Sequence, residues 1–447
     1  MIATNIRDLI QDWEERGILL RIKKEVDPKY ELGAVIHSRK GRQPFLFEKV
    51  WGYDAPMVAG LGGDRDLMAD SLGIRTSDLT DKIMQSIVNP IPTREVATGP
   101  VHDNVVMEPT ELDDIFAIPT YNEKDGGQYI VCGVLVVKDP EGGPNRYTSI
   151  RRLWHMGGNR AAVVITSQEL FNQFLQFEKE DRPLEVAVML GVVPAIILSS
   201  QIPTHLYHVD KLNVAGALLG RTLETVKCKT VDVDVLAEAE IVLEGKILPN
   251  VRVDEGPFGE VGGYYGEILP QPVIEFTAVT YRNGFINQAL FPGNNEEKLP
   301  TSLIKEATLF STVRQSVPNV KAVHITMGGT GRLHGIIQID KQSEGDGKQA
   351  ALAAFASDRD LKHVVVVNDD VDIFDLEDVE WAIATRCQAD RDVFIVPGAK
   401  GTPLEASHNL RGVSAKMGID ATYPLNAAQK FERPAIPFTI KDLRDYL

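Results

Sequence analysis

The middle third of the chain is crowded with short strand-like runs, and this feature constrains the fold most. Turns separate the runs, and few helical patterns lie between them. Gly191 and Pro194 interrupt the third run, which we interpret as buried strands. Because such strands must pair with one another, the pattern predicts a β-barrel or a β-sandwich. The runs cover residues 129–137, 161–166, 186–198, 226–236 and 239–245.

The N-terminal segment predicts an amphipathic helix followed by a strand. Thr4 or Asn5 can cap the helix and Gly17 can end it, before a strand over 18–22. A loop rich in Pro and Gly follows at 89–104 and suggests a domain boundary. The apolar face of the helix repeats at i, i+3, i+4 and i+7, at Ile6, Leu9, Ile10 and Trp13.

The pattern changes from residue 300 onward. Pro300 opens a helical stretch that runs to about Arg314. The segment 324–339 suggests two strand segments around a glycine turn, and a helix-like segment at 348–357 leads into a buried strand at 363–367. This strand–helix–strand order predicts a parallel α/β layer.

Composition excludes several classes of function. The formal net charge of −16 over 447 residues argues against a nucleic-acid surface or an anionic membrane surface. Three widely spaced cysteines form no CxxC pair, which fits a reducing cytoplasm without disulfides or a zinc site. We find no signal peptide and no apolar run of 18 residues, so we expect a cytoplasmic protein.

The segment EGPFGEVGGYYGE (255–267) is the strongest candidate for chemistry. Glu255 and Glu260 bracket a tight turn, and one of them could carry a proton. The alternative is an acidic surface turn, but Phe258 and the tyrosines that follow are too apolar for a solvated tip. A carboxylate in such surroundings needs an arginine or a hydrogen-bond donor.

The segment SIRRL (149–153) could supply that arginine. Arg151 and Arg152 are consecutive in a strand-like segment, so one of them should point inward. The alternative is that both are exposed on an edge strand.

Three further motifs have weaker signals. The aspartates of NDDVDIFD (368–375) favour a capped loop before a helix near Leu376 over a calcium loop, because the glycine and distal glutamate of an EF-hand are missing. MGGTGR (327–332) is no P-loop. His205 and His208 lack a third metal ligand.

The chain resembles the UbiD-type decarboxylases, a family that includes the polyprenyl-hydroxybenzoate and ferulic acid decarboxylases. EGPFGE followed by GYYG is similar to the family signature, and similar segments continue in the expected order over nearly the whole chain. These segments are 6–36, 45–58, 123–130, 149–153, 240–245, 364–386 and 415–425.

The resemblance implies a cofactor and a catalytic set. Family members use prenylated FMN, whose electrophilic carbon forms an adduct with an aromatic or α,β-unsaturated acid before carbon dioxide leaves. By position, the catalytic residues are Arg152, Glu255 and Glu260. Glu260 would return a proton to the carbon, Glu255 would orient Arg152, and Arg152 would stabilise negative charge near the flavin.

The family's phosphate site looks altered. The family places Asn, His and Glu there to hold a divalent metal, with potassium nearby. These positions fall on Tyr147, Glu169 and Lys211 here, and a local shift could bring Asn145 into play. We expect the Lys211 ammonium to replace the metal, with Glu169 as its partner. The competing interpretation is a decayed site that binds no prenylated flavin.

The resemblance carries over other cofactor contacts more loosely. Ser149 and Ile150 would run along the flavin, and Gln168 keeps the family residue type. The remaining predicted contacts, all near the phosphate, are Ser199, Ser200, Pro203 and Lys416.

The resemblance implies an α+β architecture of three domains. These are an N-terminal α/β domain (1–105), a central split β-barrel that binds the flavin (106–299), and a C-terminal α/β domain for oligomerisation (300–447). We expect a homodimer or homohexamer that receives its cofactor from a flavin prenyltransferase.

Two functions follow from these expectations. The first is a reversible decarboxylase of an aromatic or α,β-unsaturated acid, with Arg332 and His334 as possible contacts for a second polar group. The alternative is a cofactor-free, non-catalytic subunit of a multi-subunit carboxylase. A glycosidase is disfavoured, because five residues around one turn leave the two glutamates no way to flank a sugar.

Overall fold

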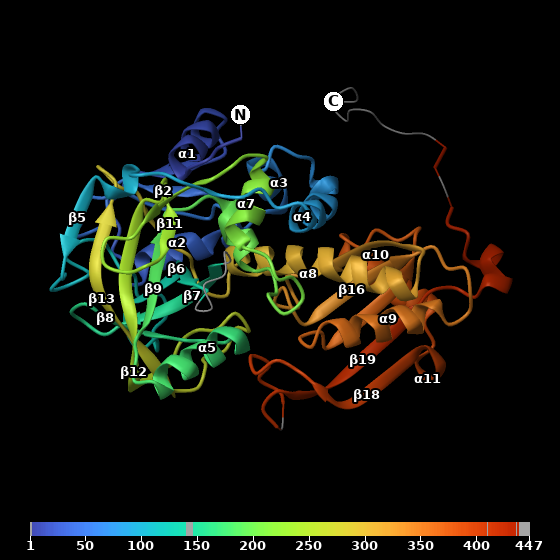
Figure 1. The fold of residues 1–447 in the computed structure, drawn as a ribbon. Helices are drawn as coiled ribbons and strands as arrows, with labels where there is room; N and C mark the ends of the chain where they lie inside the picture. Colours follow the sequence, from blue (N-terminus) through green and yellow to red (C-terminus); the bar gives the residue numbers. More distant parts are fainter. Residues whose placement is uncertain (1, 140–145, 409, 435, 438–447) are drawn as a thin grey trace. The chain divides into compact units, whose positions relative to one another are not determined.

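The computed structural model describes residues 2–139, 146–408, 410–434, 436 and 437 (Figure 1). These residues form two compact units. The first contains the described residues within 2–308, 325–333 and 402–412, and the second contains those within 309–324, 334–401 and 413–437. The mixed α+β architecture is confirmed, whereas the division into domains at 105 and 299 stays a prediction.

A seven-stranded sheet forms the centre of the first unit. β12 pairs with β13 as well as with β9, and β7 lies between β6 and β8. β6 and β7 are antiparallel, with Leu135 opposite Ser149. In sheet order the strands are β12 (Ile241–Glu255), β9 (Leu184–Leu190), β6 (Tyr129–Lys138), β7 (Arg146–His155), β8 (Arg160–Val163), β13 (Leu269–Tyr281) and β5 (Asn104–Met107).

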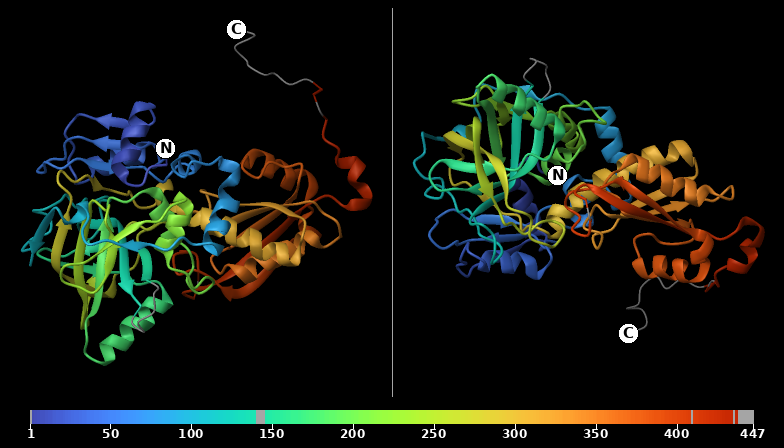
Figure 2. Two further views of the ribbon diagram at one scale, coloured as in Figure 1. Left: turned by 45° about the horizontal axis from the view of Figure 1, so that its top comes forward. Right: turned by 90° about the horizontal axis from the view of Figure 1, so that it is seen from below.

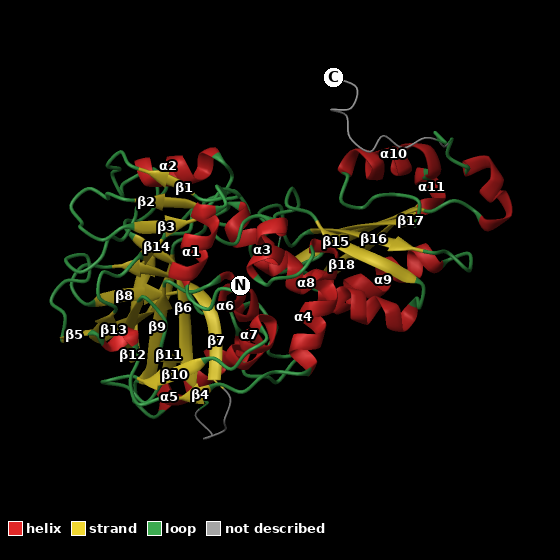
Figure 3. Cartoon of the chain, turned by 90° about the horizontal axis from the view of Figure 1, so that it is seen from above, coloured by secondary structure: helices red, strands yellow, loops and turns green. Residues whose placement is uncertain are grey.

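Two smaller sheets complete the first unit (Figure 3). One is four-stranded, and its last strand comes from a segment far along the chain. It consists of β1 (Leu20–Ile22), β2 (Phe45–Phe47), β3 (Met57–Ala59) and β14 (Asn287–Gln288). The other consists of β11 (Asp234–Leu236), β10 (Glu224–Lys227) and β4 (Arg94–Glu95).

The helices that begin in the first unit follow capping and packing rules. Asn5 caps the first helix and accepts a hydrogen bond from the Asp8 N–H, as predicted, and the apolar face is buried. Figure 2 shows the helix 168–179 beside the large sheet, where it contacts β12. These helices are α1 (Ile6–Glu15), α2 (Glu31–Ser38), α3 (Arg65–Ser71), α4 (Leu79–Val88), α5 (Gln168–Lys179), α6 (Pro194–Ser200), α7 (Lys211–Leu219) and α8 (Asn295–Ser316).

The second unit contains a five-stranded sheet. β16 and β17 are parallel and joined through α9, so the predicted α/β layer is confirmed. The strands in sheet order are β15 (Val320–Ile325), β16 (His334–Ile339), β17 (His363–Asn368), β19 (Val413–Ala421) and β18 (Val393–Lys400). The helices are α9 (Asp346–Ser357), α10 (Leu376–Arg386) and α11 (Ala389–Asp392).

Two predictions about secondary structure were wrong. The run 186–198 is strand only to Leu190, because Pro194 occupies the first turn of α6, where its fixed φ favours a helix. α8 begins at Asn295 rather than at Pro300. Pro300 lies early in this helix and removes only the hydrogen bond to the carbonyl of Glu296.

Most strand predictions were right in place but not in extent. The run 226–236 splits into the antiparallel pair β10 and β11. The loop 368–375 is a capped loop, in which Asp375 accepts from the Glu377 N–H at the start of α10.

Among the described residues, no helix combines the length and apolar character needed to cross a membrane.

Candidate active site

The turn between β12 and β13 holds both candidate glutamates. Glu255 is the last residue of β12, and the Glu260 N–H donates to the carbonyl of Tyr264 across a distance of 2.9 Å. A Cβ on Gly266 would lie 2.8 Å from Glu260 Oε1, so a larger residue here would displace the end of the Glu260 side chain. The Glu260 carboxylate is thus folded back against Gly266 of its own turn.

Arg152 on β7 joins the two carboxylates. Its guanidinium donates to Glu255 Oε2 at 2.9 Å and to Glu260 Oε1. The side chains are 14% (Arg152), 1% (Glu255) and 22% (Glu260) exposed. The sequence-predicted trio therefore meets in one place, which we call the Arg152 cluster, and β7 is not an edge strand.

Aromatic rings enclose the Arg152 cluster. The Phe258 ring lies 4.7 Å from the guanidinium carbon, and the Tyr129 ring lies 4.4 Å from the Phe258 ring. Burial lowers the pKa of Arg152, but the charges of Glu260 and Glu255 outweigh this effect and raise the pKa above its usual value. Arg152 is therefore charged at any working pH.

Sequence reasoning missed Tyr129. Its hydroxyl donates to Glu255 Oε1 at 3.0 Å, and its pKa is raised by burial and by the Glu255 carboxylate. The available signal was a tyrosine at the start of an apolar strand, since a buried phenol needs a hydrogen-bond partner. Glu255 is thus held at both oxygens, by Tyr129 and by Arg152.

Sequence reasoning also missed Glu297, in the first turn of α8. Glu297 Oε2 accepts from the Gly293 N–H at 2.6 Å. Burial raises its pKa, the negative charge of Glu260 raises it further, and Arg332 opposes both effects. A third carboxyl group therefore acts electrostatically on the Arg152 cluster, and Arg332 faces this carboxyl group.

Lys211 lies in a second group of charged side chains. It is the first residue of α7, it is 4% exposed, and its ammonium donates to the carbonyl of Ser200 at 3.1 Å. The Tyr147 ring lies 5.4 Å from Nζ. Arg151 donates to the Tyr147 hydroxyl at 3.0 Å. We call Tyr147, Arg151, Glu169 and Lys211 the Lys211 cluster.

The Lys211 cluster contains more positive charge than it can neutralise. Burial, and after it the positive charge of Arg151, lower the pKa of Lys211 to about 7, and Glu169 only partly opposes them. Among the described residues, no carboxylate forms an ion pair with Lys211 or Arg151. Asn145, the alternative residue for this site, lies outside the described residues.

The other predicted contacts differ in what they can offer a ligand. Ser149 Oγ is buried and has no hydrogen-bond partner within the described part of the chain. The hydroxyls of Ser199 and Ser200 donate to carbonyls of their own helix, and Gln168 donates to Asn172 on the surface of α5. Ile150 lies on β7, and Pro203 follows α6.

Lys416 belongs to β19 of the second unit. Its ammonium donates to the carbonyl of Arg359 at 2.9 Å and also to that of Leu361. His334 belongs to the same unit, where burial and the neighbouring His363 and His324 lower its pKa. Their predicted roles in the site stay predictions.

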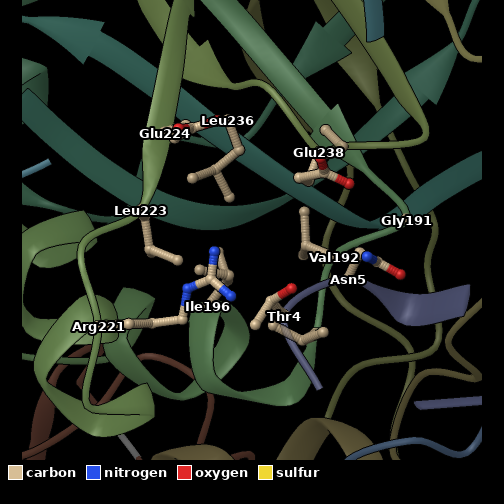
Figure 4. A pocket seen from close by; sticks show the side chains of 12 residues that line it. Thr4, Asn5, Gly191, Val192, Ile196, Arg221, Leu223, Glu224, Leu236 and Glu238 are labelled. Carbon is tan, nitrogen blue, oxygen red and sulfur yellow. The ribbon is translucent and has the colours of Figure 1, made fainter. Parts of the chain in front are cut away.

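A separate pocket contains none of the predicted site residues (Figure 4). Its lining mixes apolar side chains such as Val192 and Leu236 with charged ones. The carboxylates of Glu224 and Glu238 already pair with Arg94 and Arg282, which lie outside the lining. This pocket therefore adds nothing to the chemistry of the Arg152 cluster.

Comparisons with known proteins cover almost the whole chain. Family models of the 3-octaprenyl-4-hydroxybenzoate carboxy-lyase match the N-terminal domain at 10–87, the Rift-related domain at 94–295 and the C-terminal domain at 299–421. The anhydromevalonate phosphate decarboxylase of Methanothermobacter thermautotrophicus is 35% identical over 93% of this chain and 96% of its own. The gallate decarboxylase of Lactiplantibacillus plantarum is 30% identical over 98% and 99%.

Solved structures agree with these matches. The UbiD-class enzyme HmfF from Pelotomaculum thermopropionicum, in complex with FMN, superposes with a TM-score of 0.96 at 46% identity and covers 99% of this chain and 100% of its own. An evolved dimeric form of HmfF, in complex with prFMN, gives a TM-score of 0.91 at 44% identity with complete coverage of both chains. The chain therefore belongs to the UbiD family of carboxy-lyases.

Proposed function

We propose that the chain is a prenylated-FMN-dependent decarboxylase of a small aromatic or α,β-unsaturated carboxylic acid. The observation that carries this proposal is the Arg152 cluster, in which one arginine binds two carboxylates beside aromatic rings. The named decarboxylases among the relatives and the flavin complexes of HmfF support it.

Each member of the Arg152 cluster has a distinct role in this proposal. Glu260 is the more exposed carboxylate, so it is the one that can reach a substrate and return a proton to the carbon that has lost carbon dioxide. Glu255 is fully buried and fixed by Tyr129, so it holds Arg152 in place. Arg152 then stabilises negative charge that develops nearby.

The residues on β7 fit a polar cofactor. Ser149 Oγ, Arg151 Nε and Arg152 Nε are buried and lack hydrogen-bond partners within the described ranges. Buried polar atoms without partners are rare, and Thr148 Oγ1 is a fourth on the same strand, so this concentration on β7 suggests that a polar ligand binds beside it. When bound, the prenylated flavin would supply the electron sink for decarboxylation.

The cofactor phosphate would bind at the Lys211 cluster without a divalent metal. Two cations that lie close together and lack carboxylate partners favour an anion. Lys211 and Arg151 would neutralise the phosphate, with Tyr147, Ser199, Ser200 and Pro203 around it. Neither potassium nor manganese is required, because the two side chains supply the positive charge.

The proposal is tested by producing the chain together with a flavin prenyltransferase and measuring carbon dioxide release from a panel of aromatic and α,β-unsaturated acids. We expect release by the wild type and release that is slower by about 10²-fold or more from Glu260→Gln, although this variant still contains the flavin. A wild type that binds prenylated FMN but releases no carbon dioxide from any acid would contradict the assigned activity. A wild type without flavin would favour the alternative, a non-catalytic subunit of a multi-subunit carboxylase.

The oligomeric state, dimer or hexamer, stays a prediction.

A further inference from the structure

Three side chains of the types that bind metals meet at the end of β7, and none of them belongs to the two clusters described above. Glu111 and Asp113 lie in the loop that follows β5, and His155 is the last residue of β7. One donor atom from each of them lies within 4.8 Å of the other two. Within the described ranges, this is the one such group of histidine and acidic residues.

The pair of His155 and Glu111 has the spacing of two metal ligands. His155 Nε2 and Glu111 Oε1 are 3.0 Å apart, and the imidazole is 2% exposed. Two ligands bound at about 2.1 Å in the tetrahedral geometry of zinc are separated by about 3.4 Å, so a small outward shift of one side chain would admit the ion. Glu111 Oε1 is buried, yet no hydrogen bond to it is formed within the described part of the chain.

Neighbouring groups orient both ligands. His155 Nδ1 lies 3.2 Å from Gln128 Oε1, so an N–H at Nδ1 leaves the Nε2 lone pair directed at Glu111. The Gly158 N–H donates to Glu111 Oε2 at 2.8 Å, and Gln128 Nε2 donates to Asp113 Oδ2 at 3.4 Å. The carbonyl of Gly158, 3.3 Å from Nε2, offers a further oxygen. Ligands held in this way by outer hydrogen bonds are typical of metal sites.

We propose that Glu111, Asp113 and His155 bind one divalent transition-metal ion, and Zn²⁺ is the probe ion because imidazole and carboxylate ligands both suit it. One imidazole and two carboxylates favour such an ion over Ca²⁺ or Mg²⁺, which prefer oxygen ligands alone. The ion ties the loop after β5 to the end of β7. The simpler alternative is an ion pair between Glu111 and a protonated His155.

The test is isothermal titration of the full-length, flavin-loaded protein with ZnCl₂ after dialysis against a chelator. We expect the wild type to take up one more Zn²⁺ per chain than Asp113→Asn. Asp113→Asn and Glu111→Gln preserve side-chain size, and each should weaken the binding at least about tenfold. His205→Gln is the matched control, because it removes an exposed histidine outside the site and should bind as the wild type does.

Three results would overturn the proposal. They are a wild type that takes up no more Zn²⁺ than Asp113→Asn, an affinity unchanged in both carboxylate variants, or a loss of binding in His205→Gln. Zinc-edge X-ray absorption of the loaded wild type gives a second readout. It should show imidazole scattering that is absent from His155→Gln, and its absence from the wild type would leave only the ion pair.

Discussion

Arg151 and Arg152 are neighbours on β7, yet their guanidinium groups lie in opposite electrostatic surroundings. Arg152 binds two carboxylates, so the Arg152 cluster is complete within the chain. Among the described residues, Arg151 binds the hydroxyls of Tyr147 and Thr166 and no carboxylate, and the nearby Lys211, with a pKa of about 7, adds positive charge when it is protonated. In the Arg152 cluster, the protein supplies carboxylates that neutralise the arginine. In the Lys211 cluster, the positive charge has no carboxylate in an ion pair with it among the described residues.

In the proposed function, this difference separates the residues that act on the substrate from the residues that bind the cofactor. A buried ion pair keeps its geometry without a ligand, which suits groups that must be in place before a substrate arrives. A buried cation without a counter-charge costs free energy until an anion binds, so the binding of an anion recovers that cost. We therefore assign proton transfer to the first region and the cofactor phosphate to the second.

The largest expected effect is on turnover, from Glu260→Gln. The amide keeps the size of the side chain and a hydrogen bond to Arg152, but it has no proton to donate at working pH. The rate of decarboxylation should fall by about 10²- to 10⁴-fold, as for the loss of a general acid. Single-turnover assays of the flavin-loaded variant measure this fall.

Glu267→Gln is the matched control for this experiment. Its side chain is 75% exposed and pairs with Arg411, which is 55% exposed, so the rate should stay at the wild-type value. Equal losses in the two variants would mean that the effect comes from the hairpin as a whole.

The next effect is on stability, from Arg152→Met. This change leaves the Glu255 carboxylate buried without its positive partner, and it should lower the free energy of unfolding by about 3 to 5 kcal/mol. Urea denaturation of the flavin-free protein measures the change. Arg160→Met, which breaks an exposed pair with Glu275, should cost less than about 1 kcal/mol. A similar small cost for Arg152→Met would contradict a tightly coupled Arg152 cluster.

Lys211 should make stability depend on pH in the flavin-free protein. Its pKa is about 7 in the folded chain and 10.5 when exposed. Between these values the unfolded chain keeps a proton that the folded chain has released, so the free energy of unfolding rises with pH. The expected slope is at most about 1.4 kcal/mol per pH unit.

Denaturation of Lys211→Met between pH 7 and 10 should lack this rise. Lys227→Met removes an exposed lysine and should keep the wild-type slope. If the free energy of unfolding of the wild type and of Lys211→Met changed in the same way with pH, burial would not lower the pKa of Lys211.

The smallest effect should come from Tyr129→Phe. The change removes one hydrogen bond to the Glu255 carboxylate and leaves the two bonds of Arg152 to the glutamates intact. A loss of about 1.5 kcal/mol in the free energy of unfolding is expected from chemical denaturation. If Tyr129→Phe lowered the free energy of unfolding as much as Arg152→Met does, Tyr129 rather than Arg152 would be the main partner that stabilises the buried Glu255 carboxylate.

The sequence predicted many of the local elements and the meeting of Arg152 with Glu255 and Glu260, for identifiable reasons, whereas the catalytic roles of these residues stay predictions. The periodicity of 6–13 and the cap at Asn5 specify α1 without reference to the rest of the chain. Glu255 and Glu260 stand out because an aromatic turn is a poor place for solvated carboxylates. The apolar pattern of 186–198 predicted strand throughout, but the strand ends at Leu190 and a helix covers 194–200. Pro194 explains the difference, because proline favours the first turn of a helix.

Contacts between distant segments could not be predicted in the same way. Tyr129 is 126 residues from Glu255, and no local pattern couples a phenol to that carboxylate. Glu297 and the group of Glu111, Asp113 and His155 also depend on how strands and loops meet in space. β14 joins the N-terminal sheet through backbone pairing with β3. A strand of two residues has no sequence pattern from which this pairing could be predicted.

Native mass spectrometry of the chain co-produced with a flavin prenyltransferase tests the central claim most directly. The account predicts one prenylated FMN per chain in the wild type and in Glu260→Gln, and loss of the flavin in Lys211→Met but not in Lys227→Met. A wild type without flavin, or a Lys211→Met variant that retains it fully, would contradict the account.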